Sequence, residues 1–79
     1  SMKLKLIMRG LNYEPKAVGL AAELLPRFKR DIEELILVPS DGGRFEIFVD
    51  GEPVYSKLET GRFPESREII QAIQKRAGG

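Results

Sequence analysis

Residues 44–56 constrain the fold of this 79-residue chain most strongly. The first half, RFEIFV, alternates apolar and mostly polar side chains, which is typical of a strand with one buried face. Asp50-Gly51 follows, and this dipeptide is the strongest two-residue signal for a type I′ hairpin turn. The turn predicts pairing of Val49 with Glu52, Ile47 with Val54, and Phe45 with Ser56. Pro53 cannot donate a ladder hydrogen bond, so we expect the second strand, residues 52–58, at a sheet edge.

Hydrophobic periodicity predicts two further strands with a helix between them. Residues 3–8 and 32–38 are short, largely apolar runs of strand length. Pro15 suits the first turn of a helix that continues through residues 16–29. Pro26 predicts that the last turn of this helix is irregular. The predicted apolar stripe of the helix consists of Ala17, Val18, Ala21, Leu24, Leu25 and Phe28.

A second helix is predicted to close the chain, starting near Pro64 and ending at Gly78-Gly79. Its buried stripe is predicted to be Ile69, Ile70, Ile73 and Ala77. The element order is therefore β-α-β-β-β-α in a single domain, residues 2–79, and we interpret Ser1 as a remnant of tag cleavage.

This order predicts an α/β fold, a two-layer sandwich with a four-stranded mixed sheet. A helix joins the first two strands, so they should be parallel with a right-handed crossover. Both helices can then cover one face of the sheet. The other face is predicted to be open and to carry Lys3, Lys5, Arg44, Glu46, Tyr55, Lys57 and Phe48, with Ile7 a further candidate.

The composition excludes several classes of function. The chain has no cysteine and no histidine, so thiolate chemistry, disulfides and the commonest metal ligand are absent. Thirteen basic and twelve acidic residues leave a net charge of +1, which gives no reason to expect a nucleic-acid or membrane partner. No apolar run approaches the roughly 18–20 residues of a membrane span. We therefore expect a cytoplasmic monomer or weak dimer without cofactor or metal.

Three segments, AAELLPRF, LVPSDGGRFEIFVDG and GRFPES, together resemble the selenoprotein W-type (Rdx) family of thioredoxin-like proteins. The resemblance extends from Lys3 to about Arg76. It implies a thioredoxin-like fold, and a Cys-x-x-Cys or Cys-x-x-selenocysteine pair just before the first helix. Matching LNYEPKA to the segment after that pair puts Tyr13 on the family's aromatic residue. The two redox positions then fall on Met8 and Leu11, and neither residue can form a thiolate.

The resemblance therefore implies a family member that has lost its redox pair, and we do not expect an enzyme. The first hypothesis is a protein-interaction module that uses the former redox loop with its neighbours SDGG and GRFP. A second is a redox-linked protein acting through Met8 oxidation or through a partner's thiol. A third is an anion-binding domain at the N-terminus of the first helix. The candidate residues are Arg9, Gly10, Leu11, Asn12, Tyr13, Lys16, Gly42, Gly43, Arg62 and Phe63.

Each candidate also has a purely structural explanation. Arg9 can be a solvated loop charge, and Gly10 can simply permit a turn. Met8 and Leu11 either form an apolar patch with Tyr13 and Phe63 or pack into the core. The carboxylates Glu14, Glu65 and Glu68 suit helix starts and show no pairing for acid–base catalysis. Phe48 among lysines on the open face indicates a mixed-charge surface or a dimer contact rather than a stacking platform for nucleic acid.

Overall fold

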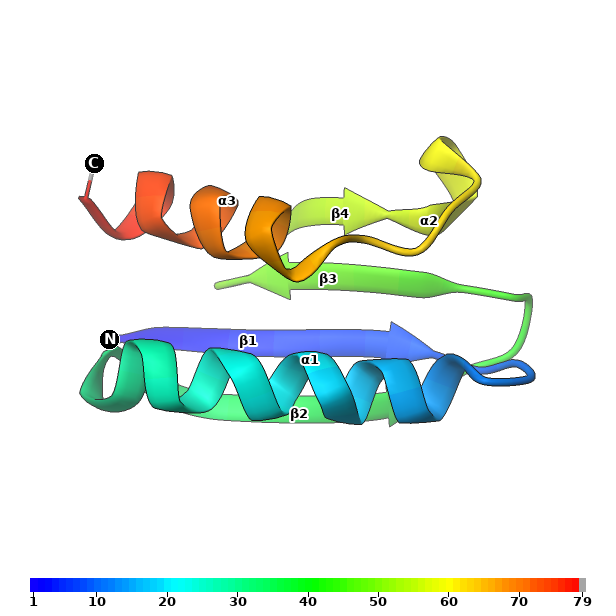
Figure 1. Cartoon of the computed structure of the whole chain (residues 1–79), viewed down its shortest axis with the longest axis horizontal. Coiled ribbons are helices and arrows are strands. Elements are labelled where there is room, and N and C mark those ends of the chain that lie inside the picture. Colours follow the sequence, from blue (N-terminus) through cyan, green and yellow to red (C-terminus); the bar gives the residue numbers. More distant parts are fainter. Residues whose placement is uncertain (79) are drawn as a thin grey trace.

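Strand β1 (Met2–Met8) lies inside a four-stranded sheet of order β2-β1-β3-β4 (Figure 1). It pairs in parallel with β2 (Ile32–Pro39) and antiparallel with β3 (Phe45–Val49), which in turn pairs with β4 (Glu52–Ser56). The computed structural model describes the backbone of residues 1–78 and the side chains of residues 1–76. The mixed sheet and the parallel first pair agree with the sequence prediction.

Helices α1 (Tyr13–Phe28) and α3 (Ser66–Gly78) lie on the same side of the sheet (Figure 1). A 3₁₀ turn (Lys29–Asp31) follows α1, so the irregular end predicted from Pro26 is present, although Pro26 itself stays within the helix. A short helix, α2 (Lys57–Thr60), was not predicted. The two-layer α/β sandwich is confirmed, with this extra helix between β4 and α3.

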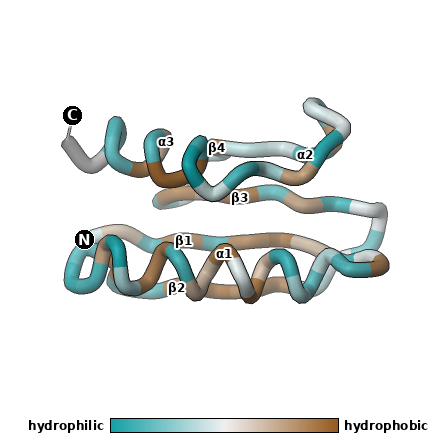
Figure 2. The backbone as a smooth tube through the Cα atoms, in the orientation of Figure 1, coloured by the Kyte–Doolittle hydropathy of each residue, from teal (hydrophilic) through white to brown (hydrophobic). Residues whose placement is uncertain are grey.

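One hydrophobic core fills the space between the sheet and the two long helices. The apolar residues recur along β1 and α1 in Figure 2, as the alternation in the strand and the stripe on the helix require. Even-numbered residues of β1 point inward, and Lys3 and Lys5 point away. The core consists of Met2, Leu4, Leu6, Met8, Ala17, Leu20, Leu24, Phe28, Phe45, Ile47, Val49, Tyr55, Ile69 and Ile73.

The predicted stripe of α1 was wrong at two positions. Val18 and Leu25 are exposed, and Leu20 is buried in their place. The stripe of buried residues runs through positions 17, 20, 21, 24 and 28, so Val18 and Leu25 fall about a quarter turn to one side of it. Both residues are apolar, and helical spacing alone does not choose between two overlapping apolar stripes.

The hairpin turn and its first pair are confirmed. Asp50 and Gly51 have φ angles of 51° and 85°, both positive, as a type I′ turn requires. Val49 pairs with Glu52, and Pro53 lies on the edge strand as predicted. The Asp50 carboxylate also accepts the Lys3 N–H at 2.8 Å, which fixes the turn against the start of β1.

The pairings further from the turn were wrong. The register shifts between Ile47 and Phe48, so that Ile47 pairs with Tyr55 and Glu46 pairs with Ser56. An extra residue on β4 makes a β-bulge, and a bulge moves every later side chain to the opposite face. Tyr55 therefore lies in the core rather than on the open face.

The strand ends at Ser56 rather than at residue 58, because the chain turns into α2. The Ser56 hydroxyl accepts the Glu59 N–H, and the buried Glu46 carboxylate accepts the Lys57 N–H at 3.1 Å. Both bonds satisfy donors of the first turn of this helix. Glu46 and Lys57 were both predicted on the open sheet face. Lys57 instead begins α2, and the buried Glu46 carboxylate on β3 accepts the N–H of that first helical residue.

The closing helix begins at Ser66, two residues after Pro64. Ile69 and Ile73 are buried and Ile70 is partly buried, as predicted. The predicted burial of Ala77 and the terminal Gly79 lie outside the described residues. Within the part of the chain that the structure describes, no helix has the length and apolar character needed to cross a membrane.

We expect Tyr55→Phe to lower the free energy of unfolding by about 1–3 kcal/mol, the cost of leaving buried polar groups unsatisfied. The Tyr55 hydroxyl lies 2.6 Å from the Arg62 carbonyl oxygen and 2.7 Å from the Thr60 hydroxyl, and so ties β4 to the segment before α3. Chemical denaturation measures the change. Tyr13→Phe is the matched control, because the Tyr13 hydroxyl makes no hydrogen bond within residues 1–78. Equal losses in the two variants would contradict this role for Tyr55.

Candidate functional site

The loop between β1 and α1, residues 9–12, is held at both ends by backbone hydrogen bonds. The Arg9 N–H donates to the Arg44 carbonyl at 3.3 Å, and the Tyr13 N–H donates to the Gly10 carbonyl at 3.1 Å. Asn12 takes a left-handed conformation, φ 69°, at the start of α1. The loop is therefore a tight, defined turn at the C-terminal end of β1 rather than an open connection.

Met8 and Leu11, the two positions that the resemblance predicts for the redox pair, differ completely in exposure. Met8 is the last residue of β1 and only 2% exposed, because even-numbered residues of this strand face the core. Leu11 lies beyond the strand and is 88% exposed, more than the other exposed large hydrophobic residues of the chain. Met8 and Leu11 do not form one apolar patch, and of the two only Leu11 has its side chain at the surface.

Behind this loop lies a cluster of three aromatic rings, which we call the aromatic cluster: Tyr13, Phe45 and Phe63. The ring of Phe63 meets those of Tyr13 and Phe45 edge-on, with centroids 4.8 Å and 5.4 Å apart. Edge-on contacts of this kind are the favoured geometry of aromatic pairs. The cluster joins the start of α1, strand β3 and the segment before α3, which lie far apart in the sequence.

Two lysines flank the aromatic cluster. The ammonium group of Lys16 lies 4.9 Å from the centre of the Phe63 ring. That of Lys57 lies 5.1 Å from the Tyr13 ring and 5.2 Å from the Phe63 ring, within cation–π range. The sequence predicted Lys16 near this site but placed Lys57 on the open sheet face. The β-bulge and the turn into α2 move Lys57, and no sequence signal marked either feature.

The glycines near the loop differ in what they permit. A Cβ at Gly10 would lie 2.9–3.1 Å from atoms of the Tyr13 ring, so a side chain there would displace the ring. Gly43 has φ 65° and approaches the Tyr13 hydroxyl, whereas Gly42, φ 95°, has only the Arg44 side chain nearby. The close approach of the Tyr13 ring explains why position 10 is a glycine. The positive φ angles of the turn explain the glycines at positions 42 and 43.

Arg62 belongs to a different group of contacts. Its guanidinium donates to both oxygens of Glu68, at 2.6 Å and 3.2 Å, and Glu68 also accepts the Glu65 N–H at 2.9 Å. The hydrogen bond from Arg62, and after it that from Glu65, hold the pKa of the Glu68 carboxyl below its ordinary value, and the same pair raises the pKa of Arg62. Arg62 therefore stabilises the start of α3.

The geometry at the start of α1 does not favour an anion. The Tyr13 N–H is already bonded within the loop, Pro15 has no N–H, and Glu14 adds a negative charge to the first turn. Arg9 lies 3.4 Å from the Asp41 carboxylate, and both side chains are exposed. Within the described residues, no three Asp or Glu side chains gather closely enough to hold a metal ion.

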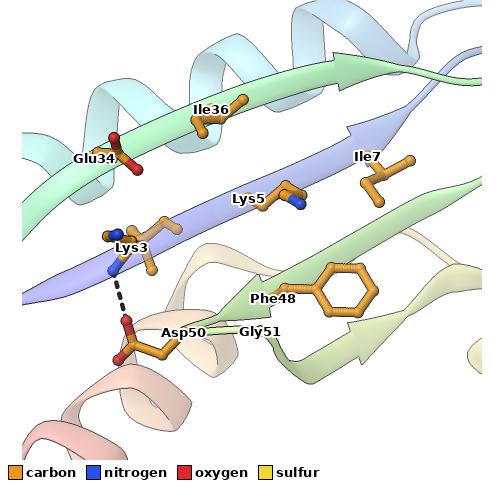
Figure 3. A pocket seen from close by; sticks show the side chains of 9 residues that line it. Lys3, Lys5, Ile7, Glu34, Ile36, Phe48, Asp50 and Gly51 are labelled. Carbon is orange, nitrogen blue, oxygen red and sulfur yellow. Dashed lines mark hydrogen bonds between the residues drawn. The ribbon is translucent and has the colours of Figure 1, made fainter.

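The open sheet face carries a shallow groove of about 620 Å³ (Figure 3). Ile7, Ile36 and Phe48 supply its apolar walls, and Lys5 projects between them. Lys3, Glu34 and Asp50 line the other end. Of the residues predicted for the open face, Lys3, Lys5, Ile7 and Phe48 line this groove, and Ile36 is an addition. Arg44, Glu46, Tyr55 and Lys57 do not line it.

The comparisons identify what this chain is similar to. A family model described as the Rdx family matches residues 10–75. A selenoprotein W-related protein from Vibrio cholerae superposes with a TM-score of 0.89 and is 32% identical, covering 95% of both chains. A protein from Bordetella parapertussis superposes with a TM-score of 0.88 at 29% identity, covering 95% of this chain and 96% of its own.

Two curated relatives match over shorter segments. Migration and invasion enhancer 1 from Bos taurus is 46% identical over 37 residues, which is 47% of this chain and 32% of that protein. The putative esophageal gland cell secretory protein 6 from Heterodera glycines is 42% identical over 53 residues, which is 67% of this chain and 20% of that protein. The chain thus spans a third or less of the length of these relatives.

We expect Gly10→Ala to destabilise the fold by about 1–3 kcal/mol, because its Cβ would meet the Tyr13 ring. Gly19→Ala is the matched control. Gly19 lies in the middle of α1 with open space around it, so alanine there should stabilise the fold by about 0.5–1 kcal/mol. Thermal and chemical unfolding of the two variants measure the difference. A neutral Gly10→Ala would show that the loop does not depend on this close approach.

We expect the ion pair of Glu68 to make stability depend on pH. A carboxyl whose folded-state pKa is lowered stabilises the fold above its unfolded pKa and loses this contribution as the pH falls through the folded value. Glu68→Gln should therefore be less stable than the parent near neutral pH, with a difference that shrinks below about pH 4.5. The effect is small, since both partners are exposed.

Urea unfolding of parent and variant across the acid range tests this dependence. Glu23→Gln is the control, since Glu23 has no ion pair or side-chain hydrogen bond within residues 1–78. A Glu68→Gln difference that stays constant with pH would exclude the ionised pair as its cause.

Proposed function

This chain belongs to the Rdx family, a redox-related family of selenoprotein W-like proteins, and from that premise we propose that it is a non-catalytic protein-interaction module. The sequence contains no cysteine, so it has no sulfur nucleophile with which to exchange a disulfide. The proposed contact surface is the loop of residues 9–12 with the neighbouring segments 40–43 and 61–64. We further propose a cytoplasmic location, as expected from the sequence.

The exposure of Leu11 carries the proposal. Leu11 is 88% exposed, so burial of its side chain contributes little to the stability of the fold. It lies on a turn that backbone hydrogen bonds hold in one conformation. A loop whose backbone is already held in one conformation loses less conformational entropy when one of its side chains inserts into a partner's pocket. Arg9 and Asp41 beside it supply the polar rim that surrounds such an anchor in protein interfaces.

The other two hypotheses gain less support from the geometry. The Met8 thioether is buried, so an oxidant in solution does not reach it without local unfolding. The start of α1 offers fewer donors to an anion, because Pro15 has no N–H and the Tyr13 N–H is already bonded. A redox role through a partner's thiol would use the same loop surface, and is therefore a special case of the interaction proposed.

The test is a comparison of three baits: the parent chain, Leu11→Asp and Leu58→Asp. Leu58 is the matched control, because it is also an exposed leucine but lies on α2. We expect a protein captured from lysate of the source organism to be recovered about tenfold less with Leu11→Asp and equally with Leu58→Asp. Arg9→Glu should weaken the same interaction, more strongly at low salt.

The recovered proteins can then be assigned to the loop by placing a photo-crosslinking residue at position 11 or at position 58. A partner that crosslinks from position 11 alone supports the proposal. If the parent and Leu11→Asp recover the same proteins in the same amounts, the loop is not the interaction site.

A further inference from the structure

Strand β2 presents an unpaired outer edge. Within residues 1–78, β2 is the last strand of the sheet, and β1 is its only neighbour (Figure 1). The Ser40 N–H donates to the Met8 carbonyl at 3.1 Å, so the even-numbered residues before it direct their backbone groups toward β1. By alternation, the N–H and C=O groups of Leu35 and Leu37 point outward, away from the sheet.

An apolar strip on α1 lies above this edge. The flank of α1 that carries Lys16 and Gly19 shares a small hollow with Phe63 near the start of α3, so this flank faces α3. Successive helical residues are about 100° apart, which puts Val18 and Leu25 on the opposite flank, over the outer side of β2. Both are exposed, as is Leu37 on the strand below, at 36%.

We propose that this edge pairs with the β2 edge of a second copy of the chain, in antiparallel orientation about a two-fold axis at Ile36. Leu35 of each copy then lies opposite Leu37 of the other, and their outward groups form four hydrogen bonds across the axis. The two Ile36 side chains, each 42% exposed in the single chain, meet on the open sheet face. The product is a continuous eight-stranded sheet.

The geometry of the helices favours a second copy over an unrelated strand. Helix α1 packs on β1 and β2 alike, so its axis lies over the space between them. Strands are about 4.8 Å apart, and the two α1 axes on either side of the new β2–β2 pair are therefore about 10 Å apart. Helices in contact pack at 8–10 Å. Val18 and Leu25 of the two copies would fill the seam between the helices.

The charges of the strand also suit a two-fold pairing. Glu33 and Glu34 lie at one end of β2 and the other end, residues 35–39, is uncharged. Antiparallel pairing puts Glu34 opposite Val38 of the second copy, and keeps the two acidic ends apart. An in-register parallel pairing would put each glutamate beside its own copy, which is unfavourable.

Sedimentation velocity of the full chain, from about 20 µM to about 1 mM, tests the proposal over the range expected of a weak dimer. We expect a monomer–dimer equilibrium that Leu25→Lys weakens by at least about tenfold, with Leu58→Lys as the matched control that leaves it unchanged. Leu37→Pro removes an outward N–H that the fold does not use, and should abolish the dimer. Leu37→Ala also truncates this side chain but keeps the N–H, so the alanine variant should still form a measurable amount of dimer.

Amide hydrogen exchange resolves the interface by residue. The amides of Leu35 and Leu37 should become protected as the concentration rises, whereas those of Glu34 and Ile36, bonded to β1, are protected throughout. A chain that stays monomeric at about 1 mM would overturn the proposal. A dimer that tolerates Leu37→Pro and Leu25→Lys but is lost in Phe48→Lys would overturn it too, and would place the second copy on the open sheet face.

Discussion

The rest of the structure depends on β1, because it is hydrogen-bonded along both of its sides. Its even-numbered residues bond to β2 and fill the core, and its odd-numbered residues bond to β3 and face outward. The end of the strand also fixes the candidate site. The Met8 carbonyl accepts the Ser40 N–H, and the Arg9 N–H reaches the Arg44 carbonyl, so the loop is anchored between β2 and β3. These backbone hydrogen bonds hold the end of β1 and the start of the loop that carries the exposed Leu11.

The sequence predicted most of the sheet, since strand alternation and turn chemistry are local signals. The Asp50-Gly51 turn gave its first pair correctly, and the prediction failed only beyond the β-bulge on β4. A bulge is one extra residue, which no local pattern marks. After the bulge, the Tyr55 hydroxyl bonds to Thr60 and Arg62, in a segment whose path was not predictable. The misplacement of Tyr55 follows from this one residue, and that of Lys57 from this residue together with the turn into α2.

The resemblance treats Met8 and Leu11 as a pair, whereas the fold buries one and exposes the other. The alternation of buried and exposed residues along β1 is enough to predict that Met8 is buried, because Met8 continues the even-numbered series of Leu4 and Leu6. Leu11 lies beyond Met8, the last residue of the strand, where this alternation no longer applies. The chain contains no cysteine, so thiol chemistry does not require the two side chains to lie together. The two positions here follow ordinary packing instead, one inside and one outside.

The two edges of the sheet are protected to different degrees against pairing with another strand, and this difference bears on the proposed pairing of two copies through β2. The outer edge of β4 carries Pro53 and lies beside the bulge, both of which discourage another strand from pairing. The corresponding stretch of β2, from Leu35 to Val38, has neither a proline nor a charge, and only Pro39 ends it. Natural sheets commonly blunt exposed edges against unwanted pairing. In this chain only the β4 edge is protected in this way. The β2 edge is regular and apolar and lies beside the exposed Val18 and Leu25, which are features of an edge that a second strand covers.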